Sequence, residues 1–455
     1  MAVARRRSVA GWGAFAALTA LGLVSTSCAG PGASDVPAPE PPVGAEPQEA
    51  PEQALPRLIG DGSTAYTGAQ PGQEHPEASQ LAPGEEPPQF VVFSWDGAGE
   101  DGSELFARFR ELGREYDADM TYFLSGVYLL PEDERARYQP PGHPPGSSDI
   151  GYLSDEHIAD TLEQLRLAWL EGNEIGTHFN GHFCGPTGVA SWSPEDWKSE
   201  TEQATWIVEN WKTTTGFADL PPLPFDYDQE LVGGRAPCLE GQDNLLAAAA
   251  DMGLRYDSSG NGLQVWPGKR HGVWDIPLQS VPMPGREFET LSMDYNFMVN
   301  QSGTANGDPA MYPYWEAQMR DGLLAAFDRA YHGNRAPLVV GNHFNAWNGG
   351  IYMDAVESVI KELCPREDVQ CVSFRQLVDW LDAQDPEVLE RLRTLGVGEP
   401  PPGGWDTFLR EGAPATPEAG GAADGSGTAG APAPEPAPAQ GATGQWAAPL
   451  APPAP

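Results

Sequence analysis

Residues 90–99 read FVVFSWDGAG, and this stretch decides the fold class. Its first four residues, Phe90 to Phe93, are all apolar, as expected for a parallel β-strand that is buried on both faces. Asp96 follows this run, so an acidic side chain stands where the strand ends. Catalytic and binding residues concentrate on loops that a rigid strand positions. The stretch therefore predicts a parallel sheet with a functional residue at its carboxyl edge.

Strand-like and helix-like segments alternate through the rest of the core. Short apolar runs predict strands near residues 120–124, 174–176, 254–256, 337–340 and 371. Helical spacing and capping residues predict helices near residues 103–112, 154–172, 194–211, 244–252, 315–331, 354–363 and from Ser373, with Gln376 completing a capping box. Repeated strand–helix units favour an α/β fold, a parallel (β/α) barrel with its functional loops at the strand ends.

The two ends of the chain have a different composition from the core. Residues 1–27 contain a basic patch and then an apolar run, which predicts a lipoprotein signal peptide with Cys28 as the lipid-carrying residue. Lipoprotein cleavage sites usually have leucine where this chain has Ser25, so ordinary signal cleavage nearby is the alternative. Residues 28–87 and 401–455 are rich in Pro, Gly and Ala, so we predict a disordered tether and a disordered tail around a domain at residues 88–400.

The charge balance limits the kinds of partner. The chain has 65 acidic and 26 basic residues, a formal net charge of −39. Nucleic acids and anionic lipid surfaces both require a basic footprint, so we expect neither as a partner. The lipid on Cys28 is the only membrane contact that we expect. We predict a monomer on the outer face of the cell membrane, or a secreted protein.

The cysteine count also indicates export. Four of the five cysteines remain after Cys28 is set aside, an even number that suits disulfide bonding in an oxidising compartment. Cys364 and Cys371 flank a short turn, which favours their pairing and leaves Cys184 with Cys238. Other pairings and free thiols remain alternatives, since proximity in sequence alone does not determine connectivity.

Two histidines follow one of the predicted strands. His178 and His182 lie four residues apart in residues 174–182, EIGTHFNGH, where a strand runs into a glycine-containing loop. Imidazole is the commonest metal ligand in proteins, and two rings at this spacing are able to meet one ion. A pair of ordinary surface or core histidines is the alternative. The pair predicts a metal site.

Three further polar residues stand at predicted strand ends: Arg235, Asp275 and His343. With Asp96 and the histidine pair they form a set suited to metal-assisted hydrolysis. A carboxylate takes a proton from water, a histidine protonates the leaving group, and the ion polarises the carbonyl. Each residue alone also has a structural explanation, as a turn residue, an ion-pair partner or a hydrogen-bonded core residue.

The order of these motifs resembles that of the polysaccharide deacetylases, also called the NodB homology domain or carbohydrate esterase family 4. The chitin-deacetylase-like branch is the most similar. The resemblance covers residues 88–382, and the motifs occur in the family's order as SWDGA at 94–98, HFNGH at 178–182, RAP at 235–237 with YDSS at 256–259, WDIP at 274–277 and His343.

The resemblance implies the fold, the cofactor and the roles of the residues. The fold would be a distorted (β/α) barrel with a groove for a sugar polymer, and His178 and His182 would bind a divalent metal, usually zinc. Asp96 would be the base that activates water, Arg235 would orient it, His343 would be the acid, and Asp275 would support that acid.

Two departures from the family pattern bear on activity. Gly97 stands where the family has the aspartate that is the third metal ligand, and Phe179 replaces a hydroxyl residue that braces the histidine loop. A site with two protein ligands should bind zinc more weakly than the usual three-ligand catalytic site.

Another carboxylate could take the place of the missing ligand. Asp96 and Asp294 are the possible third ligands, whereas we expect Glu100 and Asp101 to be loop acids without a role at the metal. The sequence thus predicts a secreted, metal-dependent deacetylase, a hydrolase of non-peptide C–N bonds, acting on a cell-surface or extracellular polysaccharide. The alternative is a catalytically inactive carbohydrate-binding relative, because of Gly97.

Overall fold

The computed structural model describes residues 57–66 and 78–410, so the predicted signal peptide and Cys28 lie outside the described residues. The strands are β1 (Arg57–Ile59), β2 (Thr64–Tyr66), β3 (Gln89–Asp96), β4 (Thr121–Leu124), β5 (Glu174–Thr177), β6 (Gly233–Gly234), β7 (Tyr256–Asp257), β8 (Asn261–Gly262), β9 (Gly268–Arg270), β10 (Val273–Asp275), β11 (Leu278–Pro282), β12 (Glu289–Leu291), β13 (Leu338–His343) and β14 (Val369–Cys371). The helices are α1 (Leu105–Tyr116), α2 (Asp155–Leu170), α3 (Pro194–Glu209), α4 (Trp211–Thr215), α5 (Tyr227–Glu230), α6 (Gln242–Ala249), α7 (Asp294–Gln301), α8 (Tyr312–Tyr331), α9 (Ile351–Leu363), α10 (Phe374–Ala383), α11 (Pro386–Leu392) and α12 (Trp405–Phe408).

A mostly parallel sheet organises the domain. Its strand order is β13-β3-β4-β5-β6-β7-β10-β9, with β14 also paired to β3, and within this sheet only the β9–β10 pair is antiparallel. All residues of β3 are buried. Val91, Phe93 and Trp95 enter one hydrophobic cluster, and Phe90 and Val92 enter a second one on the other face of the strand. This alternation explains why the strand is apolar without interruption.

The sheet closes into a distorted barrel through a side chain. Strand β11 belongs to a separate small sheet with β8 and β12, and β11 lies near β13. Gln279 of β11 accepts from the backbone N–H of Val339 (3.1 Å) and donates to the carbonyl of Pro337 (2.9 Å). An isolated parallel bridge joins Met293 to Gly341 of β13 farther along. A glutamine amide thus takes the place of a strand pair at this seam, and the predicted distorted (β/α) barrel is confirmed.

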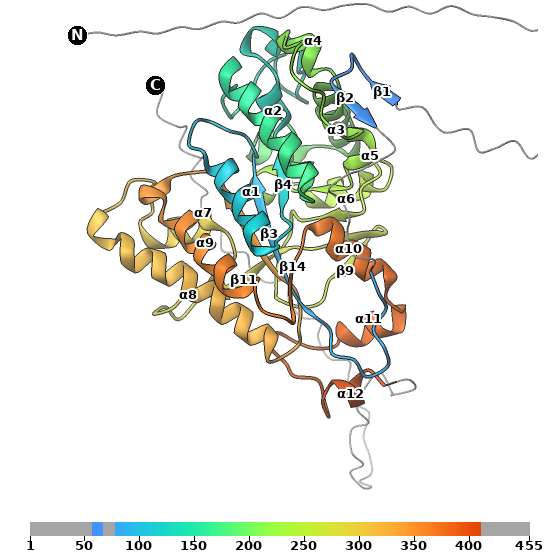
Figure 1. The fold of residues 1–455 in the computed structure, drawn as a ribbon, viewed down its shortest axis with the longest axis vertical. Helices are drawn as coiled ribbons and strands as arrows, with labels where there is room; N and C mark the ends of the chain where they lie inside the picture. Colours follow the sequence, from blue (N-terminus) through green and yellow to red (C-terminus); the bar gives the residue numbers. More distant parts are fainter. Residues whose placement is uncertain (1–56, 67–77, 411–455) are drawn as a thin grey trace, which may run out of the picture. The chain divides into compact units, whose positions relative to one another are not determined.

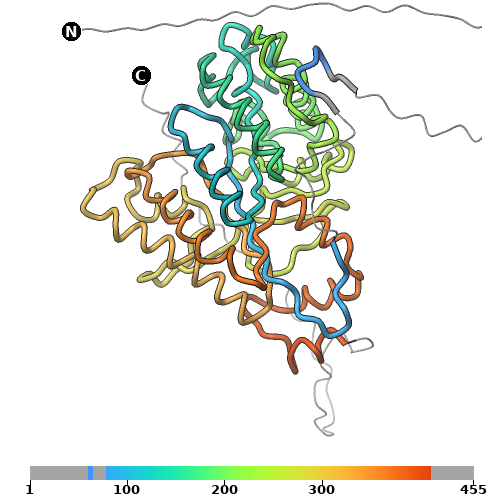
Figure 2. Tube along the Cα trace, in the orientation of Figure 1, coloured from blue at the N-terminus to red at the C-terminus, as the bar shows by residue number. Residues whose placement is uncertain are grey.

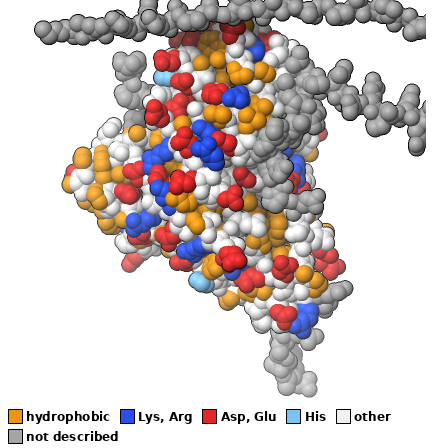
Figure 3. Space-filling model, in the orientation of Figure 1, with side chains coloured by type: hydrophobic (Ala, Val, Ile, Leu, Met, Phe, Trp, Pro, Cys, Tyr) orange, Lys and Arg blue, Asp and Glu red, His pale blue; other side chains and the backbone are white. Residues whose placement is uncertain are grey.

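Helices cover the outer face of the sheet in the order α2, α1, α9, α8 (Figure 1). Arg108 of α1 pairs with Asp354 (2.7 Å) and Glu357 of α9, which joins two helices of this layer. On the face drawn in Figure 3, acidic and basic side chains are interspersed over these helices. The capping box predicted at Ser373 and Gln376 is confirmed at the start of α10.

Both predicted disulfides are confirmed. Cys184 pairs with Cys238, and Cys364 at the end of α9 pairs with Cys371 in β14. Two disulfides are typical of proteins that fold in an oxidising compartment. No helix among the described residues is both long and apolar enough to cross a membrane.

Ordered elements lie within the predicted tether and the predicted tail, namely β1, β2 and α12. Residues 57–66 form the β1–β2 hairpin, and the backbone carbonyl of Ser63 accepts from Trp211 Nε1 (2.9 Å). Residues near Leu81 lie beside the C-terminal helices, where Leu81 N donates to Gln384 and Gly84 N donates to the carbonyl of the buried Leu409 (Figure 2). Isolated apolar residues in a Pro-rich context find partners that are distant in sequence, so composition alone did not reveal them.

The seam of the barrel gives a test of stability. Gln279 is 3% exposed, so Gln279→Leu would leave the carbonyl of Pro337 and the N–H of Val339 buried without partners. We expect a loss of about 2–5 kcal/mol in the free energy of unfolding, measured by chemical denaturation. Gln370→Leu, at an exposed position of β14, is the matched control and should change the stability by less than about 0.5 kcal/mol. Equal losses in the two variants would show that the Gln279 side chain does not close the barrel.

Candidate active site

The predicted site residues meet at the carboxyl edge of the sheet. Strand register places His343 of β13 opposite Asp96 of β3, and Asp275 of β10 opposite Asp257 of β7. His178 and Arg235 each follow directly after a strand, β5 and β6, whose last residues are also paired. Because neighbouring parallel strands end at the same edge, residues from distant parts of the chain come together there.

Arg235 lies at the centre of this group and is fully buried. Its Nη1 donates to Asp96 Oδ1 (2.6 Å) and to Ser94 Oγ (3.0 Å). Its Nε and Nη2 donate to the carbonyl and the hydroxyl of Ser258 (3.1 and 2.9 Å). The ring of Phe123 lies 4.9 Å from the guanidinium carbon. These contacts fix the orientation of the Asp96 carboxylate relative to the guanidinium.

Asp96 is 4% exposed and remains ionised. Burial opposes its charge, but Arg235, with smaller contributions from His178 and His343, outweighs that effect and holds the pKa of Asp96 below its usual range. Within the described chain, hydrogen bonds to this carboxylate reach Oδ1 and leave Oδ2 free to accept a proton.

The two histidines of the loop are neutral and close together. Their ring centroids lie 5.0 Å apart, near enough for both rings to contact one ion. Burial lowers the pKa of His178 to about 3, although Asp96 opposes this shift, and burial with His343 lowers the pKa of His182. His178 Nδ1 donates to the carbonyl of Arg235 (2.8 Å), which leaves the lone pair on Nε2 free for a ligand.

His343 has a different partner from the one that we predicted. Its Nδ1 donates to Asp294 Oδ1 (2.8 Å), and its backbone N–H donates to Asp294 Oδ2 (2.7 Å). Burial opposes a charge on this ring, but Asp294, and more weakly Asp96, raises the pKa of His343. Asp294 therefore supports the histidine, a role that we had assigned to Asp275. Among the described residues, Asp294 does not form a close three-ligand group with His178 and His182, so it is not placed as the third metal ligand.

Asp275 lies farther along the same edge of the sheet. Its carboxylate accepts from Gln242 (3.0 Å) and lies 3.6 Å from Arg270. Gln242 also donates to Asp257 (2.8 Å), and burial raises the pKa of Asp257 to about 6. Asp275 and Gln242 line a cavity of about 350 Å³ that Trp266 and Pro277 also line. Asp275 therefore does not contact the predicted acid, whose partner is Asp294.

Gly97 has the left-handed backbone conformation, with φ +65°. A Cβ built there would meet Tyr128 at 3.6 Å and Ser125 Oγ at 3.7 Å, which are ordinary van der Waals distances. Ser125 Oγ is buried and has no hydrogen-bond partner among the described residues, and burial raises the pKa of Tyr128 to about 12. Two neutral hydroxyls thus lie where a carboxylate at position 97 would extend.

Residues that the sequence did not single out hold the histidine loop. Phe179 has no hydroxyl, but its backbone N–H donates to Thr177 Oγ1 (2.8 Å). Farther along, Gly181 N donates to the hydroxyl of Tyr138 (3.1 Å), which donates to Glu200 (2.7 Å), and burial raises the pKa of Glu200 to about 7. Tyr138 and Glu200 are 62 residues apart, and no local pattern links them.

The nearby acids Glu100 and Asp101 lie in the loop before α1. Glu100 is buried and accepts from Gly102 N (3.1 Å) and Glu104 N (2.9 Å) at the start of α1, and Asp101 accepts from Ser103 N (3.0 Å). These contacts fix the loop before α1.

The donors present fit a divalent ion held by two imidazoles. Both rings are neutral, and the hydrogen bond from His178 to Arg235 leaves Nε2 available as a ligand. In the described part of the chain, one group of three potential ligands has its ligand atoms within 4.8 Å of one another, and it consists of His182, Cys184 and Cys238. Its two cysteines form a disulfide, so they offer no thiolate to a metal. Water or substrate would therefore complete the coordination of an ion at His178 and His182.

Comparisons with known proteins give matches only among solved structures. No family model and no curated protein matches the chain. A Mycobacterium smegmatis protein named as a candidate polysaccharide deacetylase is 16% identical, with a TM-score of 0.39, over 68% of this chain and 96% of that one. BA3943 of Bacillus anthracis, a CE4 family pseudoenzyme, is 10% identical, with a TM-score of 0.34, over 68% and 71%. A family 4 carbohydrate esterase from Streptomyces lividans, solved with acetate, is 12% identical, with a TM-score of 0.31, over 62% and 91%. At these values we base the function of the site on its own geometry.

The Asp294–His343 pair predicts a pH-dependent stability. A histidine whose pKa is raised in the folded state stabilises the fold below its unfolded pKa of about 6.5, and this stabilisation is lost as the pH rises through the folded pKa. In Asp294→Asn the pKa of His343 should fall, as measured by NMR titration of its ring protons. The variant should also lose more stability at pH 5 than at pH 9. An unchanged His343 titration would contradict the assigned pairing.

Proposed function

We propose that this protein is a metal-dependent hydrolase that removes acetyl groups from a cell-surface or extracellular polysaccharide. It would act outside the cell, held by a lipid on Cys28 or secreted. One observation supports the proposal most directly. Asp96, an ionised carboxylate, and His343, a histidine of raised pKa, lie opposite each other on paired strands. Two neutral imidazoles, those of His178 and His182, follow the strand β5 of the same sheet.

The two groups suit the two proton transfers of deacetylation. Asp96 is ionised near neutral pH, and its Oδ2 would accept a proton from water as the water oxygen bonds to the acetyl carbon. The bond from that carbon to the sugar nitrogen then breaks, and His343 gives the nitrogen a proton from Nε2, so that acetate and an amine leave. Pairs of groups whose surroundings push their pKa values apart are typical of acid–base sites.

The remaining residues position these groups or bind the cofactor. Arg235 orients Asp96, and Asp294 fixes the tautomer and the ring of His343. His178 and His182 would hold the divalent ion, with zinc the simplest choice for nitrogen ligands. Such an ion supplies Lewis acidity that polarises the acetyl carbonyl and lowers the pKa of water. The cavity beside Asp275, which Trp266 also lines, would accommodate part of the sugar chain.

A second candidate function is carbohydrate binding without catalysis. Gly97 provides no carboxylate at the edge of the site, and Ser125 and Tyr128 occupy the neighbouring space. A protein of this kind would bind the sugar polymer and hold the metal only weakly at His178 and His182.

Removal of one imidazole tests the metal site. Wild-type protein should bind a single zinc ion per chain, and His178→Ala should weaken zinc binding by more than about 100-fold, because loss of a ligand costs more than loss of its hydrogen-bond partner. Acetate release from chitooligosaccharides, peptidoglycan or acetylxylan should disappear in the same variant. His332→Ala, an exposed histidine at the end of α8, is the control and should retain both properties. Wild-type protein that binds no divalent metal and releases no acetate would sink the proposal.

Restoring the carboxylate distinguishes the two candidate functions. Gly97→Asp should fold, since the new Cβ meets only ordinary contacts and aspartate tolerates a left-handed conformation at a cost of about 1 kcal/mol. Its zinc affinity should rise by at least about tenfold, whereas the matched control Gly97→Asn should show no such gain. Acetate release by both wild type and Gly97→Asp supports the hydrolase. Release by Gly97→Asp alone establishes the wild type as a binding protein.

A further inference from the structure

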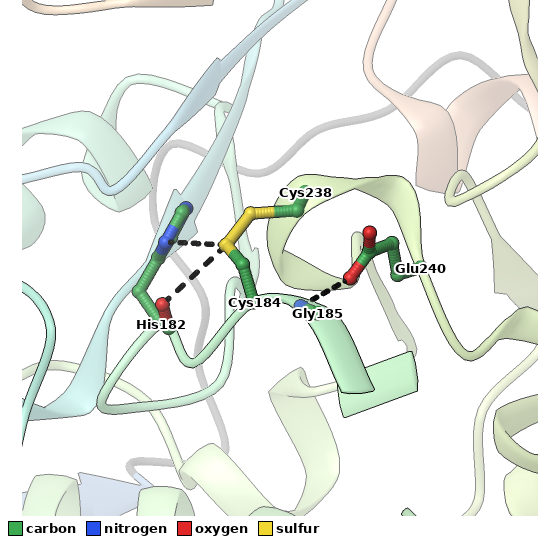
Figure 4. The surroundings of a disulfide bond; sticks show 5 residues. All are labelled: His182, Cys184, Gly185, Cys238 and Glu240. Atoms are coloured by element: carbon green, nitrogen blue, oxygen red, sulfur yellow. Dashed lines mark hydrogen bonds between the residues drawn. A yellow bond between two sulfur atoms is a disulfide. The ribbon is translucent and has the colours of Figure 1, made fainter. Parts of the chain in front are cut away.

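The disulfide between Cys184 and Cys238 lies against one of the two metal-binding histidines. Cys184 Sγ is 3.7 Å from His182 Nδ1 and 3.7 Å from the His182 carbonyl oxygen. Figure 4 draws both contacts beside the disulfide. Cys238 lies three residues after Arg235, so the bond joins the histidine loop to the loop that carries the arginine. A second contact joins the same loops, because Gly185 N donates to Glu240 (2.6 Å).

Both imidazoles are therefore oriented from the same loop, but by different means. The Arg235 carbonyl accepts from His178 Nδ1 at 2.8 Å, which is a strong and ordinary partner for a metal-binding histidine. His182 Nδ1 faces the disulfide sulfur, a weak acceptor. Its orientation depends on covalent attachment of the loop more than on hydrogen bonding.

The backbone conformation of His182 also depends on how its loop is held. His182 has φ +56°, in the left-handed region that residues other than glycine rarely adopt. Such a conformation persists only where the surrounding structure enforces it. The disulfide two residues later is the strongest tether at this point of the loop.

We propose that the Cys184–Cys238 disulfide is the positioning element of His182, so that the metal affinity of the site depends on the redox state of this bond. The inference rests on the proposed function, which assigns the metal to His178 and His182. A dithiol reductant would transfer two electrons to the bond, leave two cysteine thiols and become a disulfide itself. His182 would then lose its tether and its fixed orientation, and the metal would be held by His178 alone.

Serine variants of the two disulfides separate a local effect from a general one. Cys184→Ser/Cys238→Ser removes the bond beside His182, and Cys364→Ser/Cys371→Ser removes the one at the end of α9, which is the matched control. Zinc affinity would be measured in the full-length chain by competition with a chelator, and the visible spectrum of the cobalt(II) form would report the ligand geometry. We expect the first variant to bind zinc about 10- to 100-fold more weakly with an altered cobalt spectrum, and the control to match wild type.

A redox titration keeps the inference testable if the first variant does not fold. In the Cys364→Ser/Cys371→Ser background, Cys184–Cys238 is the one disulfide among the described residues, and a phosphine reductant cleaves it without adding thiols that bind zinc. Zinc affinity should fall at least about tenfold on reduction and return on reoxidation.

The outcomes distinguish this inference from the function on which it rests. Equal affinity in the oxidised and reduced states would overturn the inference and leave the metal site intact. Tighter binding on reduction, with a thiolate-to-cobalt absorption band, would also overturn it, because His182, Cys184 and Cys238 would then form a separate metal site. Failure of the oxidised protein to bind zinc would remove the proposed function itself.

Discussion

The buried guanidinium of Arg235 connects the parts of the site to one another and to the sheet. A charge in the protein interior is costly unless it is paired and hydrogen-bonded, and here Asp96, Ser94 and Ser258 satisfy its donors. Its backbone carbonyl also accepts from His178. One residue therefore sets the direction of the proposed base through its side chain and the tautomer of a proposed metal ligand through its main chain.

The charges around this arginine separate the two proton-transfer groups. Asp96 lies against a cation and keeps a low pKa, whereas His343 lies against the carboxylate of Asp294 and has a raised one. Paired strands β3 and β13 place both at the same level of the sheet edge. The barrel would thus provide the proposed base and the proposed acid from two groups of ordinary chemistry, because each has a partner of opposite charge.

The loop between the two histidines is held at several points instead of by one residue. Thr177, Tyr138 and the Cys184–Cys238 disulfide each fix part of it, the first two by hydrogen bonds to backbone N–H groups. This distribution explains how the loop keeps its conformation with Phe179 in place of a hydroxyl residue. The disulfide that we propose to position His182 lies outside the motif at residues 178–182.

The sequence by itself determined the strands that are marked by apolar runs, the capping box at Ser373 and the histidine pair, because these depend on neighbours a few residues away. The apolar run before Asp96 and the capping box at Ser373 are of this kind. Only the tertiary structure decided which acid supports His343. Asp294 lies 49 residues from it in sequence and reaches it because the Met293–Gly341 bridge and Gln279 close the barrel there. Contacts of this kind depend on the order of the strands in the sheet and on the closure of the barrel, and neither produces a local pattern in the sequence.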